Sequence, residues 1–342
     1  MIKLLRYEIK KMLPIIIFTS AIISIIHFLT FVKIDHVHIY NPEYAPVAVN
    51  SPLVFITIYG MLLAFIAPLV FFYKMRRINV DHYYQLPIKK EKIYIIHYIV
   101  GLLFIIIPIT ICFIVNMIQI VTKPNLFDMK YAFIFFGTLI LILITSYTIF
   151  SFSFTRCNNI IDGILNIFLY TILPFFIISS LLLIFNVINK ENLMFIPENN
   201  GFYGLIYTPI SKLTYNLNEA FLGHSNEFTT LDFISFGCWG AAAIILGILS
   251  IVLIKHDKAE NSMQKSESWF GHKTIVPIIT ITTISFFTID EYFILGLLTI
   301  SIVSYGLYAL AERNIKIGKK NLIVLGICIA VGVLLSIITG LY

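Results

Sequence analysis

Long apolar runs alternate with short polar segments along the whole chain. A helix that crosses a bilayer needs about 20 apolar residues, because each residue adds roughly 1.5 Å of rise against a hydrocarbon layer roughly 30 Å thick. The pattern therefore predicts an all-α, polytopic membrane protein with nine spans. For the shortest run, 274–289, a re-entrant or interfacial segment is the alternative. The predicted spans cover residues 13–32, 53–73, 93–121, 131–155, 161–188, 233–254, 274–289, 292–310 and 322–341.

Composition strengthens this interpretation. Of the 342 residues, 59% are hydrophobic and 12% are charged, and the mean hydropathy is +0.92. A soluble globular chain is nearer half apolar and about a quarter charged, so a soluble enzyme is excluded. The four cysteines lack the short spacing of zinc or redox motifs, which predicts free thiols and no metal. The first apolar run is too long for a signal core, and we expect it to be retained as a span.

Lysine and arginine are concentrated in alternate polar segments. Short loops rich in these residues stay on the cytoplasmic side of a membrane. With the N-terminus inside, 19 of the 24 basic residues fall in inner segments. The bias predicts a multi-pass protein of the cell membrane with a cytoplasmic N-terminus and an extracellular C-terminus. The sequence pI of about 9.0 thus reflects the flanks of spans and indicates no nucleic-acid partner.

The first twelve residues have a helical pattern of their own. Ile2, Leu5, Ile9 and Met12 recur at intervals of three and four, while basic residues occupy another face. Such a segment lies in the inner membrane interface, with its charges toward anionic headgroups of the lipid bilayer. The pattern predicts an amphipathic interfacial helix over residues 1–12. An ordinary basic flank of the first span is the alternative.

The segment between the second and third predicted spans, residues 74–94, combines charge with aromatic side chains. Pro87 suits the first turn of a helix that leads into the third span, so we expect a short helix at the cytosolic membrane surface. Tyr83, Tyr84 and Leu86 put aromatic and apolar bulk beside charges, which is typical of anchors that fill a partner's pocket. A tyrosine belt at the membrane interface is the alternative.

Within this segment, Gln-Leu-Pro-Ile-Lys-Lys-Glu-Lys at residues 85–92 follows an arginine pair and resembles the Leu-Pro-(Ile/Val)-x-Arg/Lys loop of type-2 ABC export permeases. The amphipathic N-terminus and the first six spans are similar to that family's layout as well. The resemblance implies a permease half whose loop acts as a coupling helix in a groove of a separate ABC ATPase subunit. The implied coupling residues are Tyr83, Tyr84, Gln85, Leu86, Pro87, Ile88, Lys89 and Lys90.

The sequence has no phosphate-binding loop of the pattern Gly-x-x-x-x-Gly-Lys-Ser/Thr. The dipeptide Gly318-Lys319 has no glycine five residues before it, and Lys320 replaces the required hydroxyl residue. We therefore expect no cofactor in this chain, with ATP and Mg bound by the partner ATPase.

The resemblance covers roughly residues 1–254 and implies a six-span permease core over 13–254. A cytoplasmic linker, 255–273, and an additional C-terminal membrane segment, 274–342, follow it. The outer segment 189–232 falls where the family has short re-entrant helices, although a plain extracellular loop is the alternative. The added spans are similar to the longer permeases of Gram-positive bacteria, among them exporters of amphipathic peptides. This implies a peptide substrate and a dimer with a second permease chain, identical or related.

Charges are almost missing from the middle of the predicted spans, although an ion-coupled transporter usually carries them there. By resemblance, spans two and five line the path between the two permease halves. This makes Thr57, Tyr59, Asn166 and Tyr170 the candidate substrate path. Interhelical hydrogen bonds, worth about 0.6 kcal/mol each, are the alternative role for these residues.

The function favoured by the sequence is a permease subunit of an ATP-driven ABC exporter, which is not itself an enzyme. A secondary transporter or channel without an ATPase is disfavoured by the missing intramembrane charges. A membrane-embedded enzyme is disfavoured because no His-x-x-x-His pair stands at a membrane face. A permease that protects its host from antimicrobial peptides is a further alternative function.

Overall fold

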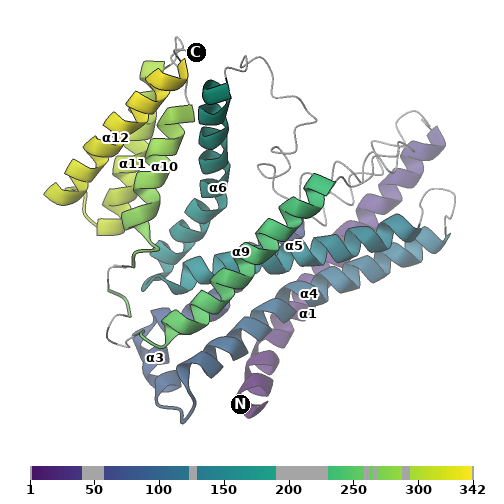
Figure 1. Ribbon diagram of the computed structural model, residues 1–342. Helices are drawn as coiled ribbons and strands as arrows, with labels where there is room; N and C mark the ends of the chain where they lie inside the picture. The colour runs from purple at the N-terminus through teal and green to yellow at the C-terminus, as the bar shows by residue number, and fades with distance from the viewer. Residues whose placement is uncertain are drawn as a thin grey trace. The chain divides into compact units, whose positions relative to one another are not determined.

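The computed structural model describes residues 2–40, 58–122, 129–189, 230–257, 260, 262–264, 268–286 and 293–340, which lie in helices and in the short connections between them (Figure 1). Seven helical segments of this part of the chain are long and apolar enough to cross a membrane. The protein is therefore an all-helical, multi-pass membrane protein. The seven segments are Ile2–Ile26, Ile58–Met75, Lys90–Val115, Phe136–Thr155, Gly237–Ile254, Phe293–Glu312 and Lys319–Ile338.

Each predicted span overlaps a helix in the described residues, and most ends agree within a few positions. Two of these helices are not among the seven segments. In α6 (Ile160–Asn189) the stretch Ile160–Leu173 counts as a shorter apolar helix. The other is α10 (His272–Phe286), whose 15 residues rise only about 22 Å, less than the hydrocarbon thickness. The described helix α10 is therefore shorter than a full span.

The N-terminal helix α1 (Ile2–Tyr40) runs without a break through the predicted end of the interfacial segment at residue 12. Among the side chains of α1 that the structure describes, Glu8, Ile16, Ser20 and Ile23 are buried. These positions are separated by eight, four and three residues, so they share one face. That face packs on α4 (Lys90–Thr122). The helix thus buries one carboxylate in line with its apolar contacts.

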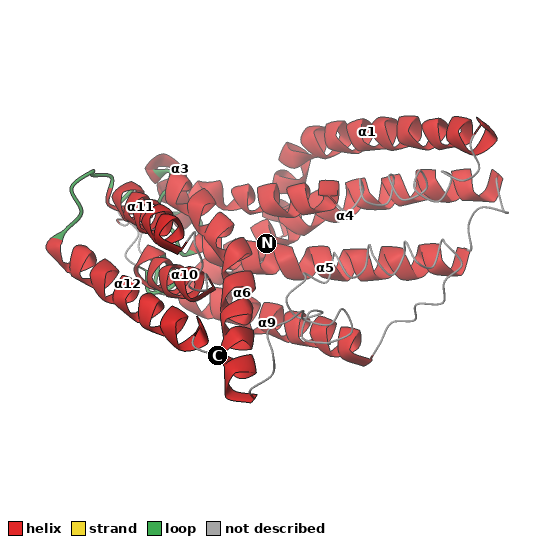
Figure 2. Ribbon diagram, turned by 90° about the horizontal axis from the view of Figure 1, so that it is seen from above, coloured by secondary structure: helices red, strands yellow, loops and turns green. Residues whose placement is uncertain are grey.

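Contacts divide the chain into two units, which are described separately. The first comprises Met1–Tyr73, Asp81–Phe152 and Tyr207–Asp257. It holds α1, α4, most of α5 (Met129–Thr155) and α9 (Thr230–Ile254), which follow one another in this order in Figure 2. Gly101 of α4 faces the Tyr147 hydroxyl of α5 so closely that a Cβ would collide with it. Glycine here allows α4 and α5 to approach.

The second unit comprises Lys74–Val80, Ser153–Ile206 and Lys258–Tyr342. Its short helix α10 packs against α6, α11 (Phe293–Glu312) and α12 (Lys319–Gly340). A buried cluster joins these four helices. The contacts thus group α6 with the last three helices, whereas the predicted domain boundaries, which stay predictions, place it in the six-span core. The buried members of the cluster are Leu169, Ile275, Val276, Tyr308 and Leu325.

Candidate functional site

The predicted coupling segment forms a tight turn between two helices. Helix α3 (Arg77–Tyr84) precedes it and α4 begins at Lys90, so the short helix lies before Pro87 and the turn itself contains the proline. The Leu86 amide donates to the Tyr83 carbonyl at 3.3 Å, and the Ile88 amide donates to the Leu86 carbonyl at 2.7 Å. Pro87 has no amide hydrogen and is tolerated between these bonds. The connection is therefore compact and internally bonded.

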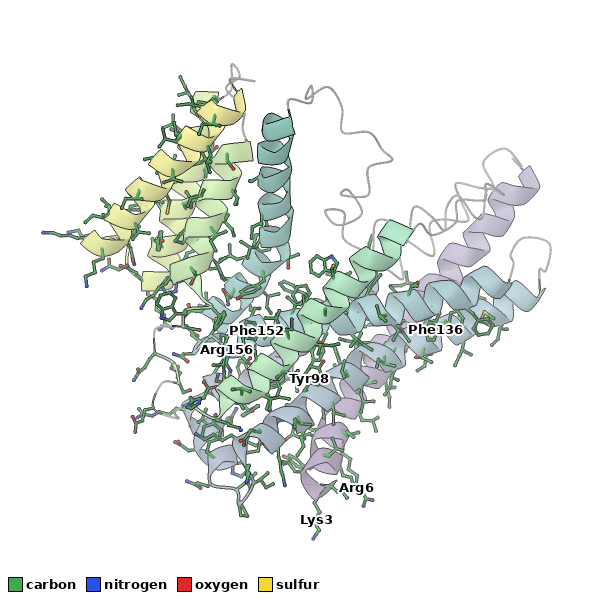
Figure 3. All side chains as sticks on the ribbon, viewed as in Figure 1. Lys3, Arg6, Tyr98, Phe136, Phe152 and Arg156 are labelled. Carbon is green, nitrogen blue, oxygen red and sulfur yellow. The ribbon has the colours of Figure 1, made fainter. Side chains whose placement is uncertain are left out.

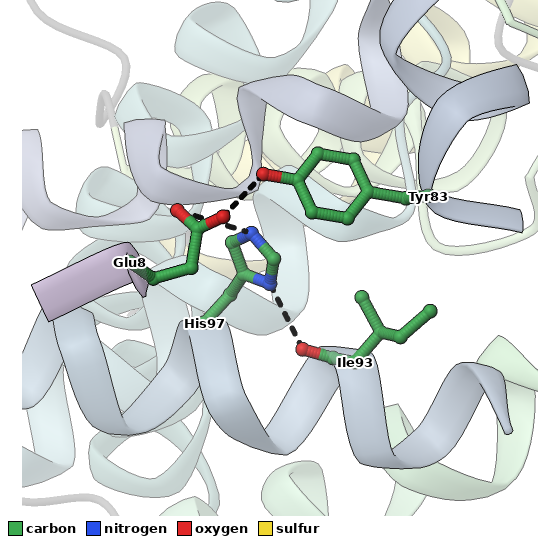
Figure 4. A network of polar contacts seen from close by, with 4 residues as sticks. All are labelled: Glu8, Tyr83, Ile93 and His97. Atoms are coloured by element: carbon green, nitrogen blue, oxygen red, sulfur yellow. Dashed lines mark hydrogen bonds and ion pairs between the residues drawn. The ribbon is translucent and has the colours of Figure 1, made fainter. Parts of the chain in front are cut away.

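A buried cluster of ionisable side chains lies directly behind this turn (Figure 4). The Tyr83 hydroxyl donates to the Glu8 carboxylate of α1. His97 of α4 donates from Nδ1 to the Ile93 carbonyl at 2.9 Å, since a carbonyl oxygen can only accept. The His97 Nε2 lies 3.9 Å from the second Glu8 oxygen. Exposed fractions of 3% for Glu8, 7% for Tyr83 and 1% for His97 place the cluster in the interior.

The surroundings of the cluster fix the protonation state of its phenol. Burial, followed by the hydrogen bond to Glu8, raises the pKa of Tyr83 well above its ordinary value. Tyr83 therefore stays neutral and keeps the proton that it donates. The Tyr73 ring packs on both partners, with centroids 4.8 Å from Tyr83 and 4.1 Å from His97. The aromatic rings exclude water from the Glu8 carboxylate, which makes its hydrogen bonds count for more.

The end of the turn is tied to a further helix. The Lys90 ammonium donates to the Asp257 carbonyl just beyond α9, at 2.6 Å, and stands 4.7 Å from the centre of the Tyr84 ring. Glu91 and Lys255 form an ion pair at 3.7 Å. Together with the Glu8 cluster, these contacts hold residues 81–91 against α1, α4 and α9. A displacement of the turn would therefore be passed to all three helices.

The structure separates the predicted coupling residues by exposure. Gln85, Pro87 and Lys89 are exposed. Tyr83 is buried against Glu8, so it supports the turn from inside. Its neighbour Tyr84 is half-buried and so are Leu86, Ile88 and Lys90.

The residues predicted for a substrate path are distributed over both units, which are described separately. Thr57 lies outside the described residues. Tyr59, in the first unit, donates to the Thr19 carbonyl at 3.3 Å. Asn166 and Tyr170, in the second unit, both donate to the Phe270 carbonyl, at 3.4 and 3.2 Å, and Asn166 also donates to the Ser153 carbonyl at 3.1 Å. The bonds from Tyr59 to α1 and from Asn166 to α5 join helices, which is the alternative role, whereas the Phe270 carbonyl lies in the turn that precedes α10.

Sequence reasoning missed Glu8 and His97, the two members of the cluster outside the coupling segment. Glu8 is the one acidic residue among the four basic residues of positions 1–12, and His97 interrupts the apolar run of the third span. A polar residue in such a place is expensive to bury without a partner. That mismatch is the signal by which both residues could have been found.

In the described ranges, no group of three or more His, Cys, Asp or Glu side chains could hold a metal ion. Comparisons of the chain with models of protein families, with curated proteins and with solved structures gave no match. The site is therefore interpreted from its own geometry.

Proposed function

We propose that the chain is the membrane-spanning permease subunit of an ATP-driven ABC exporter, with residues 85–89 as the surface that docks on a separate ATPase subunit. The observation that carries the proposal is the exposed turn held from behind by the buried Glu8–Tyr83 bond. A docking segment transmits motion only if it is stiffer than the contact that drives it. The bonds of residues 81–91 to α1, α4 and α9 provide that stiffness.

In this proposal the subunit lies in the cell membrane of a Gram-positive bacterium, with its N-terminus in the cytoplasm, and pairs with an identical or related permease chain. ATP and Mg are bound by the ATPase. The absence of a phosphate-binding loop from the sequence fits that division of labour. The cargo is a hydrophobic or amphipathic peptide, because the spans offer weakly polar, aromatic-rich surfaces. Self-protection against antimicrobial peptides is one use of such export.

The test is purification from the native host under mild conditions, with identification of whatever accompanies the protein. We expect an ABC ATPase. The double variant Gln85→Ala, Lys89→Glu changes only exposed side chains of the turn and should retain yield and melting temperature. It should lose the ATPase and the coupled ATP hydrolysis, because Lys89→Glu reverses a charge in the proposed contact surface.

The matched control is Lys320→Glu, the same charge reversal at another exposed lysine, at the start of α12. It should leave ATPase binding and coupled hydrolysis unchanged. If no ATPase accompanies the unaltered protein, a secondary transporter or channel replaces the proposal. If an ATPase is present and the turn variant retains it, the docking surface has been assigned to the wrong segment.

A further inference from the structure

An apolar groove of ≈ 950 Å³ lies between α4, α5 and α9 of the first unit. Helix α9 lines it from Gly237 to Ile251, and α5 lines it from Gly137 to Thr148. Fourteen residue steps along α9 correspond to about 21 Å, somewhat more than half of a hydrocarbon layer roughly 30 Å thick. The groove is therefore elongated on the scale of one leaflet. Figure 3 labels Tyr98, which lines the groove on α4, and Phe136, the neighbour of the lining residue Gly137 on α5.

Side chains of the described residues leave the groove unfilled. A Cβ placed on Gly137, Gly237 or Gly240 meets nothing within 4 Å. The hydroxyl groups at the Tyr98 end satisfy each other, with Tyr98 Oη and Thr148 Oγ1 2.6 Å apart. An occupant therefore needs apolar surface along its length and no hydrogen-bonding groups there.

One end of the groove leads to a group of charges. Ile251, in the last turn of α9, is followed by Lys255 just beyond the end of that helix. On α4, Tyr94 follows Lys89, Lys90 and Lys92. Four lysines thus stand against two carboxylates, Asp257 and Glu91, of which Glu91 pairs with Lys255. Lys89, Lys92 and Lys255 are exposed. This end carries net positive charge, which is complementary to an anionic headgroup.

We propose that the groove binds one acyl chain of an anionic phospholipid whose headgroup rests near Lys92 and Lys255. The acyl chain is a long apolar ligand of the kind that the groove requires. The headgroup phosphate lies at the end of the groove, next to the lysines. The surrounding bilayer delivers such a ligand directly. This site does not depend on the proposed transport function, because it requires neither an ATPase nor a substrate.

The experiment uses the purified full chain in phosphatidylcholine vesicles that contain a phosphatidylglycerol with a photoactivatable diazirine in one acyl chain. Peptide mass spectrometry locates the label. We expect label on residues 137–148 and 237–251. The label should be lost from them in the double variant Gly137→Leu, Gly240→Leu, which adds side chains at two positions of the groove where a Cβ meets nothing within 4 Å. Gly326→Leu on α12 is the matched control, because a Cβ there also meets nothing within 4 Å, and it should retain the label in the groove.

A second arm separates the headgroup from the chain. Lys92→Gln and Lys255→Gln should lower the preference for labelled phosphatidylglycerol over equally labelled phosphatidylcholine, by about fivefold for each lysine removed. Melting temperatures of the four variants should match that of the unaltered chain. Label spread evenly over all lipid-facing helices and unaffected by the leucines would overturn the proposal. So would efficient oxidative cross-linking of two chains through the exposed Cys238 of α9 together with an unlabelled groove, since a second copy would then cover this face.

Discussion

The cluster behind the turn and the packing around α10 bury polar groups in different ways. Glu8 is a carboxylate whose hydrogen bond comes from Tyr83, on another helix. Around α10 the buried groups are hydroxyls: Thr280 lies 2.8 Å from Ser304 of α11, and Ser285 donates to Ser180 of α6 at 2.9 Å. Each of these regions joins helices that are distant in sequence.

The difference lies in what each group can do when its partner is removed. Thr280 also bonds the Val276 carbonyl of its own helix at 2.7 Å, and Ser285 can donate to the Thr282 carbonyl at 2.9 Å. A hydroxyl in a helix thus has a local alternative, whereas the Glu8 carboxylate can only accept and cannot bond the backbone carbonyl oxygens of its own helix. The cluster behind the turn should therefore depend on its partners, and the α10 region should depend on its packing.

The sharpest test of this contrast is Glu8→Ala. The substitution leaves the buried Tyr83 hydroxyl without its acceptor, and such a loss costs about 2–3 kcal/mol where a charged group is involved. We expect a clearly lower melting temperature of the purified protein in detergent. Arg6→Ala, at an exposed position two residues away, should melt like the unaltered chain. Equal melting of the two variants would mean that Glu8 contributes nothing through its partners.

Packing, in contrast, should decide the stability of the α10 region. A Cβ at Gly332 of α12 would stand 2.8 Å from the Ile284 Cβ of α10. Because that atom is next to the backbone, it cannot move away, and we expect Gly332→Ala to cost about 1–2 kcal/mol through overpacking. Gly326→Ala on the same helix meets open space and should be neutral or slightly stabilising. Thermal unfolding of both variants measures the difference, and indistinguishable melting would show that α10 and α12 can separate at little cost.

Removal of a hydroxyl should matter less. For Ser285→Ala we expect a loss of about 0.6 kcal/mol, the average for a hydrogen bond between helices in a membrane. A double-mutant cycle with Ser180→Ala isolates the pair, since Ser180 can still donate to the Thr282 carbonyl at 2.8 Å. A coupling free energy as large as the effect of Glu8→Ala would refute the distinction between the two regions.

The helices of both regions could be predicted from sequence because the bilayer permits few solutions. A backbone in hydrocarbon must satisfy its own hydrogen bonds, so a long apolar run becomes a helix. For this reason α4 begins and ends within three residues of the predicted span 93–121. The helix before Pro87 was not placed, because a polar segment of eight residues has no such constraint.

The side-chain partners could not be predicted, because they depend on how each helix is rotated. Tyr83 and Tyr84 are adjacent and chemically identical, yet the first is buried against Glu8 and the second lies beneath Lys90. One residue turns a helix by about 100°, and composition does not say which tyrosine faces inward. Glu8 and His97 are 89 positions apart in the sequence, so no local pattern connects them. The groove between α4, α5 and α9 could not be predicted for a related reason, because the residues that line it have the same composition as a lipid-facing surface.

Loss of the ion pair between Glu91 and Lys255 should change the melting temperature least. Comparison with Glu8→Ala tests whether the Glu8 cluster stabilises the protein through its burial or through its charge. The two side chains are 3.7 Å apart, and that of Lys255 is 55% exposed. Water and salt screen such a pair, and exposed pairs contribute about 0.2–1 kcal/mol. Glu91→Gln should therefore lower the melting temperature barely at low salt and not at all at high salt. The effect of Glu8→Ala should persist at both salt concentrations, because counterions do not reach a carboxylate that is 3% exposed. If high salt removes the two effects alike, the Glu8 carboxylate is accessible to solvent ions. The contribution of Glu8 to stability then comes from its charge and does not depend on its burial.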